Sequence, residues 1–128
     1  MKTLLIASIM MMFAAGSNAQ EFPELAVKHG CTTCHAMEQK LKGPAWRDIA
    51  VQYRNTKDFV YAGRHYSLED GLVRKVSFGG RSNWGHAIMK PNDMDELQQD
   101  DIRQLVRFIL RLPDAPEASP HPASIPQP

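Results

Sequence analysis

The residues best suited to chemistry in this chain gather in one short motif, Cys31-Thr32-Thr33-Cys34-His35, which contains both cysteines of the 128 residues. Two thiols at this spacing lie near one another on a helical turn. They can add there to the two vinyl groups on one edge of a haem. The imidazole of His35 then projects toward the iron, and the pattern C-x-x-C-H is typical of c-type haem attachment.

Three other uses of the two thiols remain open. A thioredoxin-like redox pair needs a βαβ context that the sequence lacks. A zinc site needs a fourth ligand and usually a second pair of cysteines. A local disulfide is an alternative in an oxidising compartment. Haem attachment is favoured because the motif as a whole matches it.

The sixth coordination position of such an iron can hold a methionine, a histidine or no protein group. Four of the seven methionines lie in the first twelve residues, and Met37 is too close to His35 to reach the opposite face. Of Met89 and Met94, the first is favoured, because it lies in an irregular segment, Asn83–Asn92, where no core stripe explains it. The histidines are less favoured: His86 and His65 are alternative ligands, and His29 is expected to face solvent.

The elements that must position these residues are mainly helical. Apolar spacing and helix start and stop signals predict helices over 23–29 and 45–53, another from residue 68 after a Ser67 cap, and a last one over 100–112. Strand signals are poor, with no sustained alternation and no Asn-Gly turn. The stretch 77–95 is irregular and rich in glycine and polar residues. The sequence therefore predicts an all-α fold with long connections.

The two ends of the chain are expected to lie outside the fold. Residues 1–19 combine Lys2, an apolar run and a small-residue cleavage site, which indicates a secretory signal peptide with cleavage before Gln20. Residues 113–128 hold six of the nine prolines and are expected to form a disordered, extended tail. That leaves residues 20–112 for one folded domain.

Composition excludes several classes of function. The chain is 43% hydrophobic and 23% charged, as soluble globular proteins are, and its formal net charge of +1 gives no indication of nucleic-acid binding. No G-x-G-x-x-G or G-x-x-x-x-G-K-[ST] occurs, so a nucleotide-binding enzyme has no support. The charge is uneven: residues 28–90 carry a net +6 and residues 91–128 a net −4.

Four segments together resemble the class I c-type cytochromes, and more narrowly the small bacterial cytochromes of the c551/c552 (c8) type. They read ELAVKHGCTTCHAME, KLKGPAWRDIAVQY, WGHAIMKPN and DDIRQLVRFILRL, and the resemblance covers about residues 23–112. It implies the class I cytochrome c fold, with about four helices around one covalently attached haem.

The resemblance also implies roles for single residues. Cys31 and Cys34 would carry the haem. The Pro44 carbonyl would accept the imidazole N–H of His35, and Met89 would be the distal iron ligand. Two further haem contacts are implied at its propionates: Trp84 near one of them and Lys75 neutralising one.

The sequence departs from the family pattern in three places. Ile88 and Lys90 stand where the family has prolines beside the ligand methionine. Segment 55–67 is several residues longer than in the shortest relatives, and those lack the Pro-rich tail.

The family also suggests a close contact between Gly30 and Phe108.

The expected function is that of a periplasmic monohaem c-type cytochrome, a one-electron carrier and not an enzyme, with iron held by His35 and Met89. Partners would be redox proteins that dock transiently on a basic rim formed by Lys28, Lys40, Lys42 and Lys90. We expect a monomer that binds no nucleic acid and is not stably inserted in a membrane. The alternative is the haem subunit of a periplasmic oxidoreductase complex.

Overall fold

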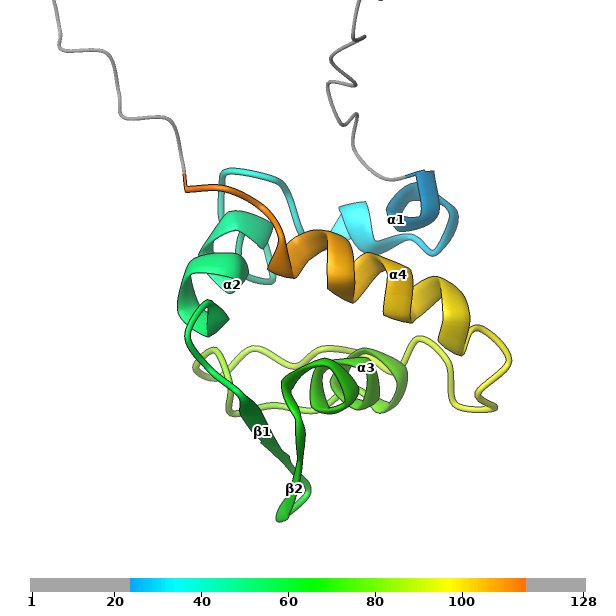
Figure 1. The fold of residues 1–128 in the computed structure, drawn as a ribbon. Helices are drawn as coiled ribbons and strands as arrows, with labels where there is room; N and C mark the ends of the chain where they lie inside the picture. The colour runs from blue at the N-terminus through cyan, green and yellow to red at the C-terminus, as the bar shows by residue number, and fades with distance from the viewer. Residues whose placement is uncertain (1–23, 115–128) are drawn as a thin grey trace, which may run out of the picture.

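The computed structural model describes residues 24–114 (Figure 1). The expected signal peptide and nearly all of the Pro-rich tail lie outside the described residues. The elements in chain order are α1 (Glu24–Lys28), the 3-10 turn η1 (Cys31–Thr33), α2 (Trp46–Tyr53), β1 (Asp58–Tyr61), β2 (Arg64–Ser67), α3 (Leu68–Phe78) and α4 (Gln99–Leu110).

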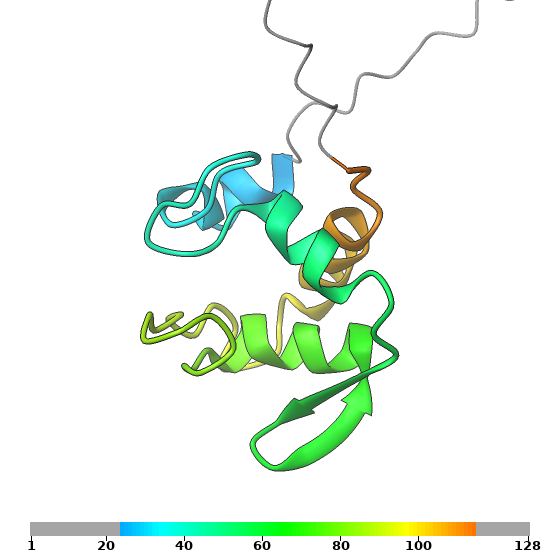
Figure 2. The ribbon, with the colours of Figure 1, turned by 90° about the vertical axis from the view of Figure 1, so that its left-hand side faces the viewer.

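The helix α4 is the centre of the arrangement, because it packs against each of the other three helices (Figure 1). Its N-terminal half lies beside α1 and its C-terminal half beside α2, while α3 runs on the other side. Two long loops, the one after η1 and the one after α3, lie on the same side of the molecule (Figure 2). Between residues 24 and 114, no helix has the length and apolar character needed to cross a membrane.

Local sequence explains where the helices begin and end. The predicted cap is confirmed: Ser67 Oγ accepts a hydrogen bond from the Asp70 N–H at 3.2 Å. Gly30 has a φ of 68°, a left-handed conformation that turns the chain from α1 into η1. The apolar face of α4 is also confirmed, with Ile102, Leu105 and Val106 buried.

The core has two parts, both of which include residues of α4. One surrounds Phe59, Val73 and Ile102, and joins α3 and α4 to the first strand. The other surrounds Ala26 and Trp46, and joins α1 and α2 to the other face of α4. Helix α4 therefore lies between α3 on one side and α1 and α2 on the other.

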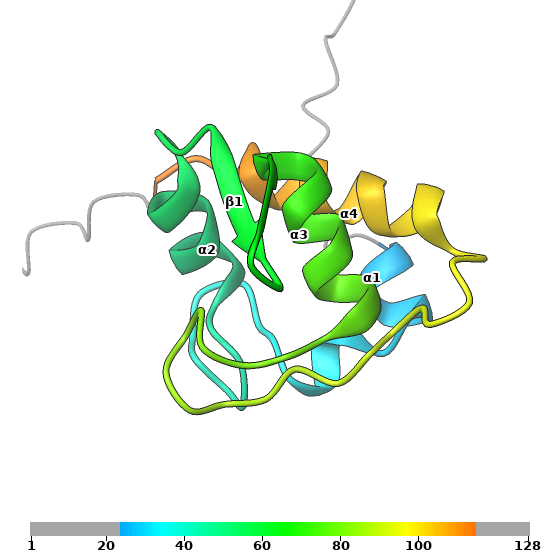
Figure 3. The ribbon, with the colours of Figure 1, turned by 90° about the horizontal axis from the view of Figure 1, so that it is seen from below.

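The short hairpin β1–β2 is a feature that the sequence reading missed (Figures 1 and 3). It occupies the extended segment 55–67, and its strands pair in antiparallel register with Phe59 opposite Tyr66. The turn is Ala62-Gly63, both at positive φ (48° and 74°), as a type I′ turn requires. Such turns usually contain Asn-Gly. Because Ala62 occupies the first turn position here, the sequence gives no local indication of the hairpin.

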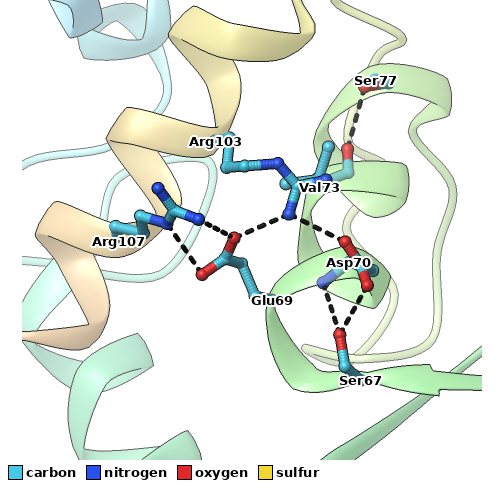
Figure 4. Close-up of polar contacts among 7 residues, drawn as sticks. All are labelled: Ser67, Glu69, Asp70, Val73, Ser77, Arg103 and Arg107. Carbon is cyan, nitrogen blue, oxygen red and sulfur yellow. Dashed lines mark hydrogen bonds and ion pairs between the residues drawn. The ribbon is translucent and has the colours of Figure 1, made fainter.

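An ion-pair network joins the first turn of α3 to α4 (Figure 4). Glu69 binds Arg103 at 2.6 Å and Arg107 at 2.9 Å, and Asp70 binds Arg103 at 2.8 Å. The two guanidinium groups hold the pKa of the Glu69 carboxyl below its ordinary value. The Ser67 and Arg103 hydrogen bonds lower the pKa of Asp70 in the same way.

Candidate haem-binding site

The cysteine motif lies on η1 and the turn that follows it. The backbone N–H groups of Cys34 and His35 both donate to the Cys31 carbonyl, at 3.2 and 3.0 Å, which makes the turn compact. Both thiols are partly buried, and burial raises the pKa of Cys31. Within residues 24–114, no three His, Cys, Asp or Glu side chains gather into a metal site, so a zinc site has no ligand set there.

His35 is buried, and its ring is held in one orientation. Its Nδ1 lies 2.7 Å from the Pro44 carbonyl oxygen, which can only accept a hydrogen bond, so Nδ1 carries the proton. The lone pair of Nε2 is then available to a metal. The ring also stacks on Trp46, with centroids 6.0 Å apart and planes 13° apart.

Gly43 lies against the face of this imidazole, and sequence reasoning missed its role. A Cβ atom at position 43 would come within 2.4 Å of His35 Cε1. The Gly43 N–H donates to the Cys34 carbonyl at 2.8 Å, which holds the loop over the motif. The Gly-Pro pair at 43–44 was the available signal for this close contact.

Met89 lies in the long loop after α3, and backbone hydrogen bonds fix its position. It forms an antiparallel bridge with Gly80, with N–H to carbonyl distances of 2.9 and 3.0 Å. Gly79 makes the approach possible, because a Cβ there would lie 2.4 Å from the Met89 carbonyl oxygen. Asn92 holds the following residues on α3 by donating to the Val76 carbonyl at 3.0 Å.

His35 and Met89 both line one cavity, which reaches the molecular surface. Cys31 lies on its wall, and the other walls are mainly apolar. Trp46, Ile49 and Val76 line it. Sequence reasoning missed six further apolar or aromatic residues in its walls: Tyr53, Phe59, Leu72, Leu105, Val106 and Ile109. Two cysteines at one edge, a nitrogen donor and a sulfur donor fit a covalently attached haem.

A second opening shares Cys31, His35 and Met89 with this cavity and faces solvent. Cys34, Lys42 and Lys90 also line it. The loop that carries Met89 and the segment after η1 lie on the two sides of this region in Figure 2. The edge of the site nearest the two thiols is therefore open to solvent.

Pro44, Trp84 and Lys75 all line the first cavity. Trp84 packs edge-on against Tyr53, with ring centroids 6.5 Å apart. Burial lowers the pKa of Lys75, whose Nζ donates to the Arg81 carbonyl at 3.4 Å. A half-buried ammonium group of this kind is well placed to pair with an anionic group in the cavity.

The structure separates Met89 from its rivals. Met94 is 67% exposed, and His86 is exposed and lines neither opening. His65 is exposed on the hairpin, where its Nδ1 lies 3.1 Å from an Asp58 carboxylate oxygen.

One minor expectation is wrong. His29 does not face solvent: its side chain is 9% exposed, and its Nε2 lies 2.9 Å from Asp101 Oδ2. The same carboxylate binds Lys28 at 2.7 Å, so this lysine of the expected basic rim is already paired. The space around Gly30 does not itself require a glycine, because a Cβ there would meet no heavy atom within 4 Å. The positive φ of Gly30, and not packing, accounts for the glycine.

Comparison with known proteins gives a consistent result. The family model for cytochrome c matches residues 19–113. The chain is 41% identical over 88 residues to cytochrome c-551 of Allochromatium vinosum, covering 69% of this chain and 82% of that protein. It is 32% identical over 111 residues to cytochrome c-552 of Hydrogenobacter thermophilus, covering 87% and 97%.

Solved structures agree with these sequence matches. The crystal structure of Nitrosomonas europaea cytochrome c552 superposes with a TM-score of 0.56 at 31% identity, covering 68% of this chain and 94% of that one. The class I cytochrome c fold is thereby confirmed, with the hairpin as a minor addition. The chain belongs to the cytochrome c family, whose members carry one covalently attached haem c, and it is an electron-transfer protein and not an enzyme.

Proposed function

We propose that this protein is a periplasmic one-electron carrier whose haem would be bound through Cys31 and Cys34, with His35 and Met89 as the two protein ligands of its iron. The proposal rests on one observation: His35 and Met89 line the same cavity. The proton of His35 is on Nδ1, bonded to the Pro44 carbonyl, so Nε2 is available to bind a metal. The bound haem supplies a one-electron couple between iron(III) and iron(II).

The protein residues have separate tasks in this proposal. The Pro44 carbonyl keeps the His35 Nε2 lone pair directed into the cavity. Met89 would hold the iron as its second protein ligand, which would leave no position for a substrate to bind it. The apolar walls exclude water, which together with a methionine ligand favours the reduced iron and a relatively high potential. Lys75 and Trp84 would contact the propionates.

Partner proteins would dock at the solvent-facing opening. Lys42 and Lys90 line it, Lys40 lies in the same loop as Lys42, and all three are exposed. Ile88, 60% exposed, adds apolar surface beside them. A basic rim around an apolar contact supports transient, salt-sensitive docking of acidic partners.

The proposed location is the periplasm, reached through the signal peptide expected at residues 1–19. The mature protein would then consist of the domain over 20–112 and the tail over 113–128, and would be monomeric. Size-exclusion chromatography of native extract tests the last point. A carrier elutes alone at its own mass, whereas co-elution with a larger partner would favour the subunit of an oxidoreductase complex.

The ligand assignment is tested by Met89→Ala, with Met94→Ala as the matched control in the same loop. Oxidised wild-type holoprotein is expected to show the weak far-red absorption band of a methionine–iron bond. Met89→Ala should abolish this band, while Met94→Ala should leave it unchanged, because the Met94 side chain is exposed. A band that survives Met89→Ala, or is absent from the wild type, would refute Met89 ligation.

A further inference from the structure

The hairpin reaches the base of the loop that carries Met89. The hydroxyl of Tyr61, the last residue of β1, donates a hydrogen bond to the Gly79 carbonyl oxygen at 3.1 Å. Gly79 is the C-cap residue that directly follows α3. A side chain from the extended segment therefore contacts the backbone that precedes the methionine loop.

The hydrogen bond falls on a peptide group that also holds Met89. The Gly79 carbonyl and the Gly80 N–H belong to the same planar peptide. On one side this peptide accepts from Tyr61, and on the other its N–H donates to the Met89 carbonyl at 2.9 Å. Hydrogen bonds that share one peptide group polarise it and strengthen one another.

This peptide is flanked by two glycines, so no Cβ atom restricts its orientation. Gly79 and Gly80 have φ values of 73° and 120°, conformations in which only glycine is unstrained. A peptide between two glycines meets little steric resistance to turning, so its orientation depends on its hydrogen-bond partners. Tyr61 supplies the partner for its carbonyl.

The base of Tyr61 is itself firmly held. Two residues earlier in β1, Phe59 is 5% exposed, lines the cavity and packs on Gly71 of α3, where a Cβ would come within 2.5 Å of Phe59 Cβ. The hairpin is thus attached to α3 twice: Phe59 packs on the helix itself, and Tyr61 bonds to the residue that follows it. These two attachments fix the position of the hydroxyl.

We propose that Tyr61 is a positioning residue for the Met89 ligand, acting through the Gly79–Gly80 peptide. The inference rests on the proposed ligation of iron by Met89. It gives the extended segment 55–67 a task in the site: the hairpin slows the departure of the methionine from the iron.

The test compares Tyr61→Phe with Tyr66→Phe in the holoprotein. Tyr66 is the matched control because it lies on the other strand of the hairpin and its ring packs under the Arg74 guanidinium, 4.8 Å away, a contact that phenylalanine retains. The first readout is the rate at which imidazole displaces the methionine from oxidised protein. We expect a rate about two- to tenfold faster in Tyr61→Phe, the effect of losing one hydrogen bond, and a wild-type rate in Tyr66→Phe.

The second readout is hydrogen exchange at the Gly80 amide, which does not depend on ligation. This amide should be protected in wild type and in Tyr66→Phe, and should lose much of its protection in Tyr61→Phe. Equal imidazole rates and equal Gly80 protection in all three proteins would overturn the proposal. So would a fall in global denaturation midpoint of Tyr61→Phe large enough to account for both changes.

Failure of the ligand assignment would look different. In that case wild-type protein would lack the methionine–iron band, and imidazole would bind without displacing a methionine. Loss of Gly80 protection in Tyr61→Phe would still show that the hydroxyl orients the peptide. Retained protection would overturn the proposal in either case.

Discussion

At the scale of single residues, both proposed iron ligands are held by backbone groups. The Pro44 carbonyl orients His35, and the Gly80 amide and carbonyl hold Met89. The sequence indicates His35 and Met89 as ligands by residue type, but their positions in the fold depend on neighbouring glycines. Gly43 and Gly79 leave room that any side chain would fill.

Gly43→Ala tests this account on the histidine side. The added methyl group would meet His35 Cε1 at 2.4 Å, so the ring or the loop must shift. We expect a loss of about 1–3 kcal/mol in the free energy of unfolding, as overpacking produces, together with an altered haem spectrum. Denaturant unfolding and absorption spectra of the holoprotein measure both.

The control for this variant is Gly63→Ala in the hairpin turn. It introduces strain at a φ of 74° but meets no neighbouring atom. It should lower stability and leave the haem spectrum as in the wild type. If Gly43→Ala also left the spectrum unchanged, Gly43 would not position the imidazole.

The sequence predicted the chemistry of these residues better than their surroundings. C-x-x-C-H and the isolated methionine are local patterns, and the structure brings His35 and Met89 to one cavity. The burial of His29 could not be read in the same way. It depends on Asp101, 72 positions away on α4, and no local pattern reports such a contact.

At the scale of elements, the helices follow from local signals and the hairpin does not. The Ser67 cap and the apolar stripe of α4 are visible in the sequence and confirmed in the structure. The strands are only four residues long, and their turn lacks the usual Asn-Gly. Contact of Phe59 with Gly71 stabilises them, a tertiary interaction that propensity does not contain.

The ion-pair network between α3 and α4 predicts a pH dependence of stability. Arg107 and Arg103 lower the folded-state pKa of Glu69 from its ordinary value of 4.5. A carboxyl with a depressed pKa stabilises the fold above its ordinary pKa, and this contribution is lost as the pH falls through the depressed value. The network therefore stabilises the fold at neutral pH and not in strong acid.

Glu69→Gln tests this dependence. The variant should melt about 1–5 °C below wild type at pH 7, the effect expected of a partly exposed network, and the difference should vanish in strong acid. Glu96→Gln, an exposed glutamate outside this network, is the control and should match wild type throughout. A difference for Glu69→Gln that persists undiminished in acid would contradict an electrostatic origin.

At the scale of the whole molecule, the charge is distributed unevenly along the chain. Residues 28–90 carry a net +6 and residues 91–128 a net −4, although the chain as a whole is nearly neutral. Lys42 and Lys90 of the positive part lie at the solvent-facing opening. Lys28 is paired with Asp101, so the basic rim is smaller than the sequence suggested.

Charge reversal at the rim tests its role in electron transfer. The double variant Lys42→Glu/Lys90→Glu should slow oxidation of the reduced protein by ferricyanide, an anionic probe, by about tenfold at low salt. The effect should disappear near 1 M salt, where the Debye length is about 3 Å. Stopped-flow absorbance measures these rates.

The matched control is Lys57→Glu/Arg64→Glu, which makes the same change in net charge at and beside the hairpin. It should slow the reaction much less, because neither residue lines an opening of the site. Equal slowing by the two double variants would assign the effect to net charge and not to the rim.

Exposure of the reduced wild-type holoprotein to carbon monoxide at neutral pH tests the central claim most directly. If the iron is closed on both faces by His35 and Met89, the absorption spectrum should stay unchanged after carbon monoxide is added. A prompt spectral shift would mean that the sixth position is open, and would contradict the assignment of this protein as a closed-iron electron carrier.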